Sequence, residues 1–314
     1  MLILLAMVFL FTSTAFRAYT RFSKVHHSRP FGSRSGLYAS KRDVSKLPRV
    51  FLKNNQEISL GQSLDLDADT SHYLSNVMRL KVGFKFRGFN SRLHGGEYLF
   101  EVISVNKKSN EVVCMANEQL ISLTEENRDA QTLPISLYFG VFKKPKMKML
   151  FEKCTELGIR SFHPIHTQFT IMNGKEDFLD SSASYERIIR ESVEQSERFY
   201  IPYLDQKVMK LSEMIDSYNY EENGPLLVCM ERSRQSLPLI QALTQVAPHC
   251  KNGNIGLLLG PEGGFSTEEQ ALLASLDESQ VILCTLGEGV LRAETAGIAA
   301  LSQAAAWLDI QRNI

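Results

Sequence analysis

The chain has 314 residues, of which 44% are hydrophobic, so it can bury a large core and does not belong to the disordered class. Its formal net charge is zero, from 35 basic and 35 acidic residues. Seven of the basic residues and none of the acidic ones precede Asp43, which leaves 28 basic against 35 acidic residues in the remainder. A protein-wide basic surface for nucleic acid is therefore excluded, and any RNA contact must come from local patches.

Residues 1–42 have the features of a targeting leader rather than of a folded domain. Leu2–Phe11 is an apolar run too short to span a bilayer comfortably, and Ser13–Ala15 places small residues near a candidate cleavage site. From Phe16 to Lys41 the chain contains Arg and Ser and no acid. This order resembles the bipartite leaders of plastid proteins in algae with secondary plastids. We therefore expect a plastid protein with no membrane contact in its mature form. A mitochondrial presequence, secretion and an N-terminal anchor are the alternatives.

The five cysteines are scattered and show no C-x-x-C spacing. This pattern argues against a structural zinc site and against a disulfide framework, and it weakens the secretory interpretation. No other cluster of ligand residues suggests a metal, so we expect none. Cys284 lies in an apolar run and is predicted to be a buried thiol.

Residues 43–123 are predicted to form a small β-rich domain, in the form of a barrel. Its strands are short, alternate in part between apolar and polar residues, and are separated by hairpin-type turns at Gly95-Gly96 and Ser109-Asn110. A short helix is expected over Thr70–Arg79, and the polar run Thr124–Thr132 is expected to be a linker. The predicted strands are Arg49–Lys53, Glu57–Leu66, Lys85–Phe89, Tyr98–Val105 and Glu111–Ala116.

Residues 133–314 alternate apolar strands with helical segments, which predicts a mostly parallel sheet covered by helices on both faces. Ser266, followed three residues later by Glu269, predicts an N-cap with a capping box. The terminal helix is rich in alanine, which indicates either close packing of another backbone or simply a good helix former. The predicted strands are Pro134–Phe142, Ser161–His166, Pro225–Glu231, Ile255–Leu259 and Val281–Leu286. The predicted helices are Pro145–Leu157, Tyr185–Phe199, Leu237–Val246, one beginning after Ser266, and Ala296–Leu308.

A first glycine-bearing loop, Gly260-Pro-Glu-Gly-Gly264, follows an apolar strand. It offers backbone N–H groups and little side-chain bulk, so it can wrap a nucleotide-like ligand or hold phosphate at the next helix. It lacks the Gly-Lys-Ser/Thr of a Walker A loop and the dinucleotide G-x-G-x-x-G pattern. An ordinary tight turn between strand and helix is the alternative.

A second loop follows the next strand, and it combines Leu286, Gly287, Val290 and Leu291 with a charged end. Apolar residues beside exposed backbone suit an adenine held between loops. Arg292 could stabilise a developing anion, or form only a structural ion pair. Glu294 begins the last helix, where complementing the helix dipole is its alternative role. Because both loops follow strands of one sheet, we expect a ligand pocket at their carboxyl ends.

The two loops in this order resemble the signature of the RsmE family, which are SPOUT-type methyltransferases. The motifs are Leu259-Gly-Pro-Glu-Gly-Gly-Phe-Ser266 and Leu286-Gly-x-x-Val-Leu-Arg-x-Glu-Thr-Ala296. Upstream matches support them: Lys143-Lys-Pro-Lys-Met147, Thr155-Glu-Leu-Gly-Ile159, Pro164, Glu194-Gln-Ser-x-Arg198 with Pro202, and, nearer the N-terminus, His72 with Val77-Met-Arg-Leu-Lys-x-Gly83. The resemblance covers residues from about 47 to 308.

This resemblance implies methylation of uridine N3 in small-subunit ribosomal RNA, here of an organelle, with S-adenosylmethionine as cofactor. It also implies a trefoil-knotted domain, a preceding PUA-like domain and a homodimer. Arg292 and Glu294 are the expected catalytic residues, with Glu262 a second candidate for the base. The expected cofactor-binding residues are Leu259, Gly260, Pro261, Glu262, Gly263, Leu286, Gly287, Val290, Leu291 and Thr295.

Local basic residues are the expected RNA contacts. Lys143, Lys144, Lys146 and Lys148 crowd a helix start, which disfavours cations and so favours an anionic partner over a merely solvated face. A second strip is expected from Arg79, Lys81, Lys85 and Arg87. Such residues would position RNA while the target uridine leaves its stack. The predicted RNA-binding set is Lys143, Lys144, Lys146, Arg79 and Arg198.

Three positions depart from the family pattern: Gly289 replaces a basic residue, Ala293 replaces Thr, and Gln168-Phe-Thr170 stands where Arg-Ser is usual. These departures keep open a non-catalytic RNA-binding assembly factor with the same fold. A tRNA methyltransferase of this fold is a second alternative. An α/β enzyme that holds ATP or GTP phosphate on the Gly260 loop is a third.

Overall fold

The computed structural model describes residues 44–53, 58–90, 96–106, 108–109, 111–124, 131–171, 174–231, 236–250 and 253–312. The chain divides into two compact units, Met1–Ser45 and Lys46–Ile314, and all the elements below lie in the second. The predicted leader, residues 1–42, lies outside the described residues. None of the helices that the structure describes is long and apolar enough to cross a bilayer.

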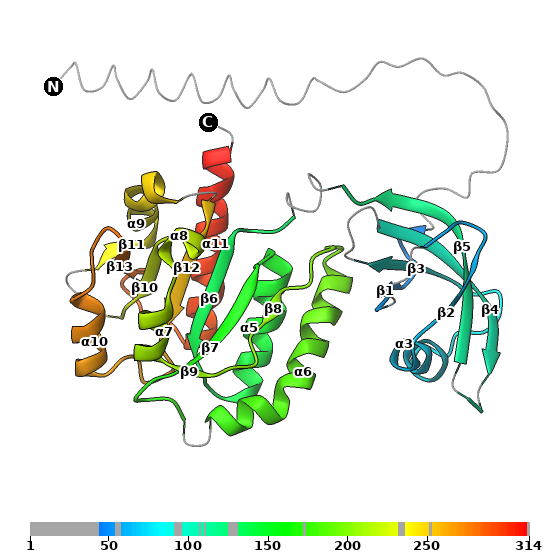
Figure 1. Ribbon diagram of the computed structural model, residues 1–314, viewed down its shortest axis with the longest axis horizontal. Helices are drawn as coiled ribbons and strands as arrows, with labels where there is room; N and C mark the ends of the chain where they lie inside the picture. The colour runs from blue at the N-terminus through cyan, green and yellow to red at the C-terminus, as the bar shows by residue number, and fades with distance from the viewer. Residues whose placement is uncertain are drawn as a thin grey trace, which may run out of the picture. The chain divides into compact units, whose positions relative to one another are not determined.

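The first part of the large unit is a five-stranded sheet in the order β1-β3-β4-β5-β2 (Figure 1). Strand β1 runs parallel to β3, and the other pairs are antiparallel. Phe86, Phe100 and Leu74 pack in its core. The elements are β1 (Arg49–Phe51), β2 (Ser63–Asp65), α3 (Ala68–His72), the π-helical η1 (Tyr73–Val77), β3 (Lys85–Asn90), β4 (Gly96–Asn106) and β5 (Glu111–Ser122).

Two predictions for this part need correction. The strand expected over Glu57–Leu66 is only Ser63–Asp65 among the described residues. The expected helix over Thr70–Arg79 begins earlier, because Asp67 caps it by accepting a hydrogen bond from the Thr70 N–H, and it changes to a π-helix at Tyr73. It ends before Arg79, whose φ of 56° is left-handed and incompatible with a helix. Closure of the sheet into a barrel stays a prediction.

The second part is a parallel sheet in the order β11-β13-β10-β12-β6-β7-β8, with β9 beside β7. All its strand pairs among the described residues are parallel, as predicted. The strands are β6 (Ile135–Gly140), β7 (Ser161–His166), β8 (Tyr203–Leu204), β9 (Met209–Lys210), β10 (Leu226–Cys229), β11 (Leu237–Pro238), β12 (Ile255–Leu259) and β13 (Val281–Thr285). The helices are α5 (Lys144–Leu157), α6 (Gly174–Gln195), α7 (Leu211–Ser217), α8 (Tyr220–Asn223), α9 (Leu239–Val246), the 3₁₀ turn η2 (Ala247–His249), α10 (Thr267–Ala274) and α11 (Ala293–Arg312).

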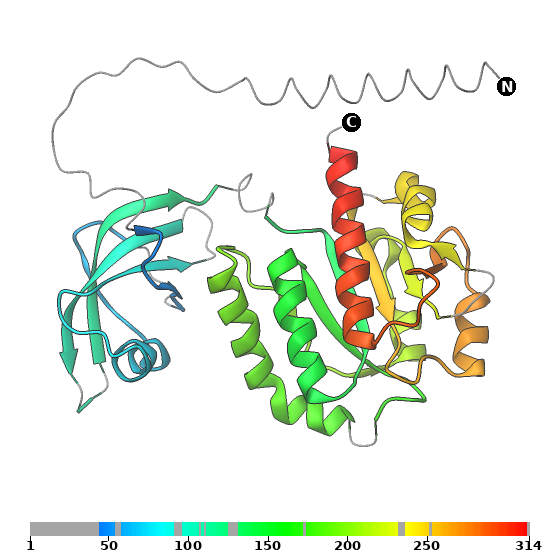
Figure 2. The same ribbon diagram turned by 180° about the vertical axis from the view of Figure 1, so that it is seen from behind.

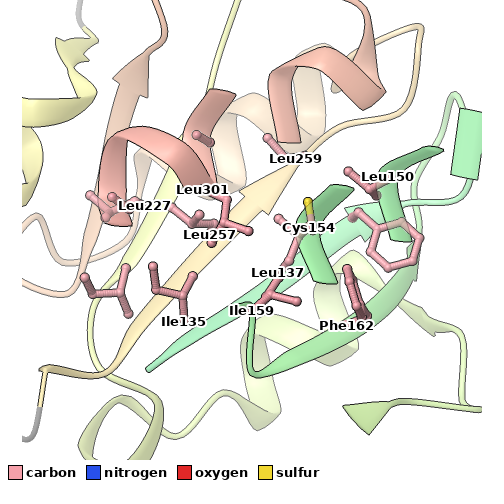
Figure 3. Packing of buried hydrophobic residues seen from close by; sticks show 14 of the residues in the cluster. Ile135, Leu137, Leu150, Cys154, Ile159, Phe162, Leu227, Leu257, Leu259 and Leu301 are labelled. Carbon is pink, nitrogen blue, oxygen red and sulfur yellow. The ribbon is translucent and has the colours of Figure 1, made fainter. Parts of the chain in front are cut away.

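Both faces of this sheet are covered by helices, which confirms the predicted α/β architecture (Figures 1 and 2). Alternate residues of one strand face opposite layers: Leu257 packs with α5, α9 and α11, whereas Leu258 packs with α7 and α10. Figure 3 shows the first of these layers, in which Leu137, Leu257 and Leu301 belong to the same buried cluster as Leu150 of α5. The sheet is thereby fixed from both sides, and its carboxyl edge carries the loops.

The helices differ most from the predictions in α6 and α11, and α9 begins at Leu239 because Leu237–Pro238 form β11. Helix α6 begins at Gly174 and ends at Gln195, whereas Tyr185–Phe199 was expected, because polar residues hide the helical period in its first turns. Helix α11 extends the expected Ala296–Leu308 to Ala293–Arg312. Its small residues allow a close approach: a Cβ on Gly297 would lie 2.4 Å from Leu150 of α5, and Ala300 and Ala304 are fully buried. Close packing is thus the role of this face of α11.

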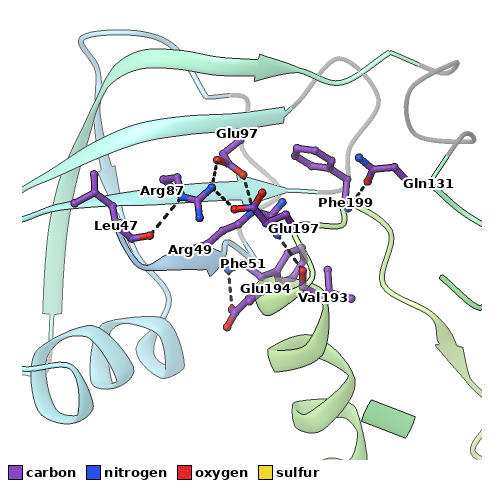
Figure 4. Close-up of polar contacts among 10 residues, drawn as sticks. All are labelled: Leu47, Arg49, Phe51, Arg87, Glu97, Gln131, Val193, Glu194, Glu197 and Phe199. Carbon is purple, nitrogen blue, oxygen red and sulfur yellow. Dashed lines mark hydrogen bonds and ion pairs between the residues drawn. The ribbon is translucent and has the colours of Figure 1, made fainter. Parts of the chain in front are cut away.

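A buried ion pair between Arg49 of β1 and Glu97 of β4 lies where the first sheet contacts α6 (Figure 4). Arg49 Nε lies 2.5 Å from Glu97 Oε2, Arg49 Nη1 donates to the Val193 carbonyl, and the guanidinium covers the Phe89 ring at 3.5 Å. Glu194 Oε1 accepts from the Phe51 N–H at 2.9 Å. Burial lowers the pKa of Arg49, and the hydrogen bond and charge of Glu97 oppose that shift. These contacts fix the first sheet to α6.

Candidate active site

A cavity of about 480 Å³ lies at the carboxyl ends of β10, β12 and β13, in the size range of small-molecule sites. The two loops singled out in the sequence form most of its wall, so the structure brings the predicted segments together. Its lining includes Leu259, Gly260, Pro261, Glu262, Gly263, Leu286, Gly287, Val290, Leu291 and Arg292. Of the expected cofactor-binding residues only Thr295 is outside this set, and its side chain is exposed on α11.

The first loop is shaped by close backbone packing. A Cβ on Gly140, at the end of β6, would lie 2.5 Å from the Pro261 ring, so glycine there lets the loop lie against the sheet edge. The loop turns back on itself through a 2.9 Å hydrogen bond from the Gly264 N–H to the Pro261 carbonyl, and Gly264 has a left-handed φ of 71°. The capping box of Ser266 and Glu269 then begins α10, as predicted.

The second loop gives the cavity apolar walls and open backbone. Gly287 has φ of 135°, which requires glycine, and its N–H donates to Thr285 Oγ1 at 3.4 Å. Val290 is 52% exposed although it is apolar. A Cβ on Gly289 would meet nothing within 4 Å. This loop therefore leaves room for a ligand with a flat apolar part.

The expected catalytic residues occupy different environments. Arg292 lines the cavity and is exposed. The side chain of Glu294 is buried in the first turn of α11, and its Oε2 has no hydrogen-bond partner among the described residues. The nearest cation is the Lys146 ammonium, 4.0 Å away. A buried carboxylate with so little compensation is costly in the free protein. Among the described residues Glu294 is not part of the cavity lining, whereas its chain neighbours Arg292 and Ala293 are.

Lys146 belongs to the cavity as well as to the predicted basic patch. Its Nζ lies 3.1 Å from Glu262 Oε1 in the first loop and also approaches Glu294. It therefore links α5, the first loop and α11, and its expected RNA contact stays a prediction. Lys143, Lys144 and Lys148 are exposed around the start of the same helix. The predicted patch therefore has one member that faces the cavity and three that face solvent.

The other basic residues are spread over different environments. Arg79 is exposed. Arg87 is paired with Glu97 and Glu197 and is only 12% exposed, so it does not extend the expected strip with Lys85. Arg198 donates to the main-chain carbonyls of Glu156 and Gln131, and burial lowers its pKa. The structure thus gives Arg198 a structural role at the end of α6; its expected RNA contact stays a prediction.

Sequence reasoning missed a third wall of the cavity, which comes from the end of β10. Cys229, Met230 and Glu231 line it because β10 lies between β12 and β13 in the sheet, although it comes before both in the sequence. The Cys229 and Cys284 sulfurs are 3.8 Å apart as register partners. Cys284 is fully buried, as predicted, and its hydrogen bond with Cys229 and its burial raise its pKa. The signal that could have found this wall is the apolar run Leu226–Met230, which is followed directly by the charged Glu231.

Two of the three departures from the family pattern lie in the lining of the same cavity. Gly289 and Ala293 line it, and Ala293 is buried. Gln168 is exposed, and its main-chain N–H donates to Glu269 Oε1 of the capping box at 2.8 Å. Among the described residues no group of three or more His, Cys, Asp or Glu side chains is placed to hold a metal ion.

The fold and the cavity define an α/β protein with a nucleotide-sized site at the carboxyl edge of a parallel sheet. Residues 129–305 match the family described as RNA methyltransferase domain. Ribosomal RNA small subunit methyltransferase E of Rickettsia conorii is 27% identical over 263 residues, which covers 82% of this chain and 95% of the relative. The Bacillus subtilis protein of the same name is 28% identical, covering 82% of this chain and 95% of its own.

A solved structure gives the same picture. The crystal structure of Ribosomal RNA small subunit methyltransferase E from Neisseria gonorrhoeae, bound to S-adenosyl methionine, superposes with a TM-score of 0.60 at 23% identity. It covers 82% of this chain and 95% of that one. This chain belongs to the RNA methyltransferase domain family, in its RsmE branch. The predicted class, an RNA methyltransferase, is thereby confirmed.

Proposed function

We propose that this protein methylates uridine N3 in the small-subunit ribosomal RNA of an organelle. The observation that carries the proposal is that both signature loops line the same cavity. Arg292 lies at the rim of this cavity, and apolar residues of the two loops line its interior. The residues fit S-adenosylmethionine: Leu259, Leu286 and Val290 suit its adenine, and the flanking glycines admit it close to the backbone. When bound, this cofactor supplies a methyl group on a positively charged sulfur.

The chain's own contribution is to the uridine. Loss of the N3 proton leaves a negative charge on the uracil ring, and Arg292 is placed to stabilise it from the cavity rim. Glu262, at the rim, and the buried Glu294 are the candidate bases for that proton. Binding of the uracil ring in the cavity accelerates methyl transfer further, because it holds N3 in a fixed orientation toward the methyl group.

Several finer features belong to the same proposal. We propose a knot in the second part, a PUA-like role for the first sheet, and a homodimer. The path of the chain after β13 supports the knot. Strand β13 lies on the far side of β10 from β12, yet the following helix α11 crosses back and packs against β12 and α5.

The plastid location rests on the composition of residues 1–42. Attaching those residues to a fluorescent protein tests the plastid location against the mitochondrial alternative.

Transfer of labelled methyl from S-adenosylmethionine to separate RNA pools tests the function. The pools are small ribosomal subunits lacking the modification, large subunits and tRNA, each digested to nucleosides. The proposal expects label as 3-methyluridine in the small-subunit pool. Label in tRNA would support the tRNA alternative, and label in no pool despite cofactor binding would support the assembly factor. Displacement of the cofactor by ATP or GTP would indicate the nucleotide-binding enzyme.

A further inference from the structure

Phe169 is an exposed aromatic residue at the rim of the cavity. It lies in the turn after β7, and 49% of its surface is exposed. Its side chain rests directly on the first loop, because a Cβ on Gly263 would lie 2.7 Å from the Phe169 Cβ and 3.2 Å from its Cγ. Gly263 itself lines the cavity. An apolar ring is therefore held beside the opening, with half its surface in water.

The turn that carries Phe169 is held at both ends. The Thr170 N–H donates to the Thr167 carbonyl at 3.1 Å, and the Thr167 N–H donates to Thr170 Oγ1 at 2.9 Å. The Gln168 N–H donates to Glu269 Oε1, while Glu269 Oε2 accepts from the Ser266 N–H. The residue before Phe169 is thus tied to the capping box of α10. A ring presented on such a fixed turn loses little entropy when a flat partner covers it.

The surroundings of this ring favour a nucleotide base as that partner. Gly140 of β6 pairs in register with Ile165 of β7, so the segments after these two neighbouring strands emerge at the same edge. The segment after β6 carries the exposed Lys143 and Lys144, and the segment after β7 carries Phe169. Cations that meet phosphate beside an aromatic ring that stacks a base are the usual elements of single-stranded nucleic-acid recognition.

We propose that Phe169 stacks on an unpaired base of the RNA at the cavity rim and so positions the target uridine. This inference rests on the proposed function, which requires the uridine to leave its stack and enter the cavity. Phe169 is a positioning residue in this account, since the ring takes no part in methyl transfer. Stacking is independent of base identity, so Phe169 contributes RNA affinity rather than the choice of uridine.

Kinetics of the full chain with Phe169→Leu and Phe169→Tyr tests the proposal. Leucine keeps an apolar cover on Gly263 without a π face, whereas tyrosine keeps the ring. Phe169→Leu should raise the KM for small ribosomal subunits roughly 5- to 100-fold, which is the loss of affinity expected when one base no longer stacks on an aromatic ring. Phe169→Tyr should keep the KM of the wild type, because it retains the ring. The Kd for S-adenosylmethionine should stay unchanged. The control is Ile240→Ala, an apolar side chain on α9 that is 43% exposed.

An unchanged KM in Phe169→Leu would overturn the proposal. A parallel loss of cofactor affinity would also overturn it, because it would show that the ring only supports the Gly263 loop. A second readout does not depend on activity: photo-crosslinking to small-subunit RNA transcribed with 5-iodouridine. The tryptic peptide Ser161–Lys175 should carry the crosslink in the wild type and lose it in Phe169→Leu. If the wild type transfers no methyl group, the proposed function fails while this crosslink still decides the role of Phe169; a crosslink found only elsewhere would contradict it.

Discussion

Two buried glutamates, Glu97 on β4 of the first sheet and Glu294 beside the cavity, are compensated very differently. Both carboxylate oxygens of Glu97 are held, Oε2 by Arg49 at 2.5 Å and Oε1 by Arg87 at 3.2 Å (Figure 4). Oε2 of Glu294 has only the Lys146 ammonium at 4.0 Å. Their side chains are nearly equally buried, at 3% and 7% exposed. The two glutamates therefore do not differ in burial; they differ in how many charged partners their carboxylate oxygens have and how close those partners lie.

This difference indicates what each region is built for. A buried charge with complete partners fixes two elements in one arrangement, and removing one partner leaves the other uncompensated. A buried charge with incomplete partners weakens the free protein but strengthens electrostatic interactions with whatever enters beside it. We infer that the Arg49–Glu97 pair serves stability, and that the cavity holds its charges for the RNA and the cofactor.

Arg292→Ala should produce the largest effect. Removing a donor that stabilises a developing anion typically lowers the rate about 100- to 1,000-fold, and single-turnover methyl transfer measures this directly. The melting temperature should not change, because Arg292 is exposed. Arg187→Ala, on the exposed face of α6, is the control and should transfer methyl groups at the normal rate. Equal rates for the two variants would show that Arg292 has no part in the chemistry.

Arg49→Ala should be the most destabilising of these changes. Loss of one member of a buried ion pair costs about 3–5 kcal/mol of unfolding free energy, which urea denaturation can measure. Lys53→Ala is the matched control, since the Lys53–Asp69 pair is solvent-exposed and such pairs contribute little. If both variants unfold at the same urea concentration, the contacts of Arg49 with Glu97 and with the Val193 carbonyl do not stabilise the fold.

Glu294→Gln should separate the two regions most clearly. The unfolding free energy should stay the same or rise, because no strong partner is lost and a costly buried charge is removed, while methyl transfer falls. Glu97→Gln should do the reverse and weaken the fold while leaving the intrinsic rate of the folded fraction intact. A loss of stability in Glu294→Gln as large as in Arg49→Ala would end the contrast between the two glutamates.

The smallest effect concerns His163, which lies on the far side of the sheet from α5. Burial lowers its pKa, and the hydrogen bond and charge of Asp205, 3.4 Å from Nδ1, only partly offset this. The unfolded chain therefore binds the proton more readily than the folded one. The contribution of neutral His163 to the stability of the folded state is present above a pH of about 6.5. It is lost as the pH falls through the lowered pKa of His163 in the folded protein. In His163→Gln the melting temperature should fall less than in the wild type when the pH is lowered from neutral to mildly acidic. If it falls equally in both proteins, groups other than His163 cause the decrease.

The cavity was largely predictable from the sequence because its two main walls are local. Gly260 and Gly287 each follow an apolar strand by a residue or two, so spacing alone places them at one sheet edge. The apolar run at Leu226–Cys229 indicated a strand, but it did not show that this strand ends at the cavity, because strand order is set by packing across the sheet. The partners of Lys146 and Arg198 were hidden for the same reason: each lies more than forty residues away in sequence. Charge patterns show that a cation is present and leave open what neutralises it.

A crystal structure with S-adenosylhomocysteine bound is the most direct test of the central claim. It would show whether the weakly compensated region is the one that receives the cofactor. The account predicts the adenine between the loops of Gly260–Gly264 and Leu286–Leu291, with the sulfur facing the side of Arg292. Density for the ligand at any other surface, or a cavity that excludes it, would contradict the account.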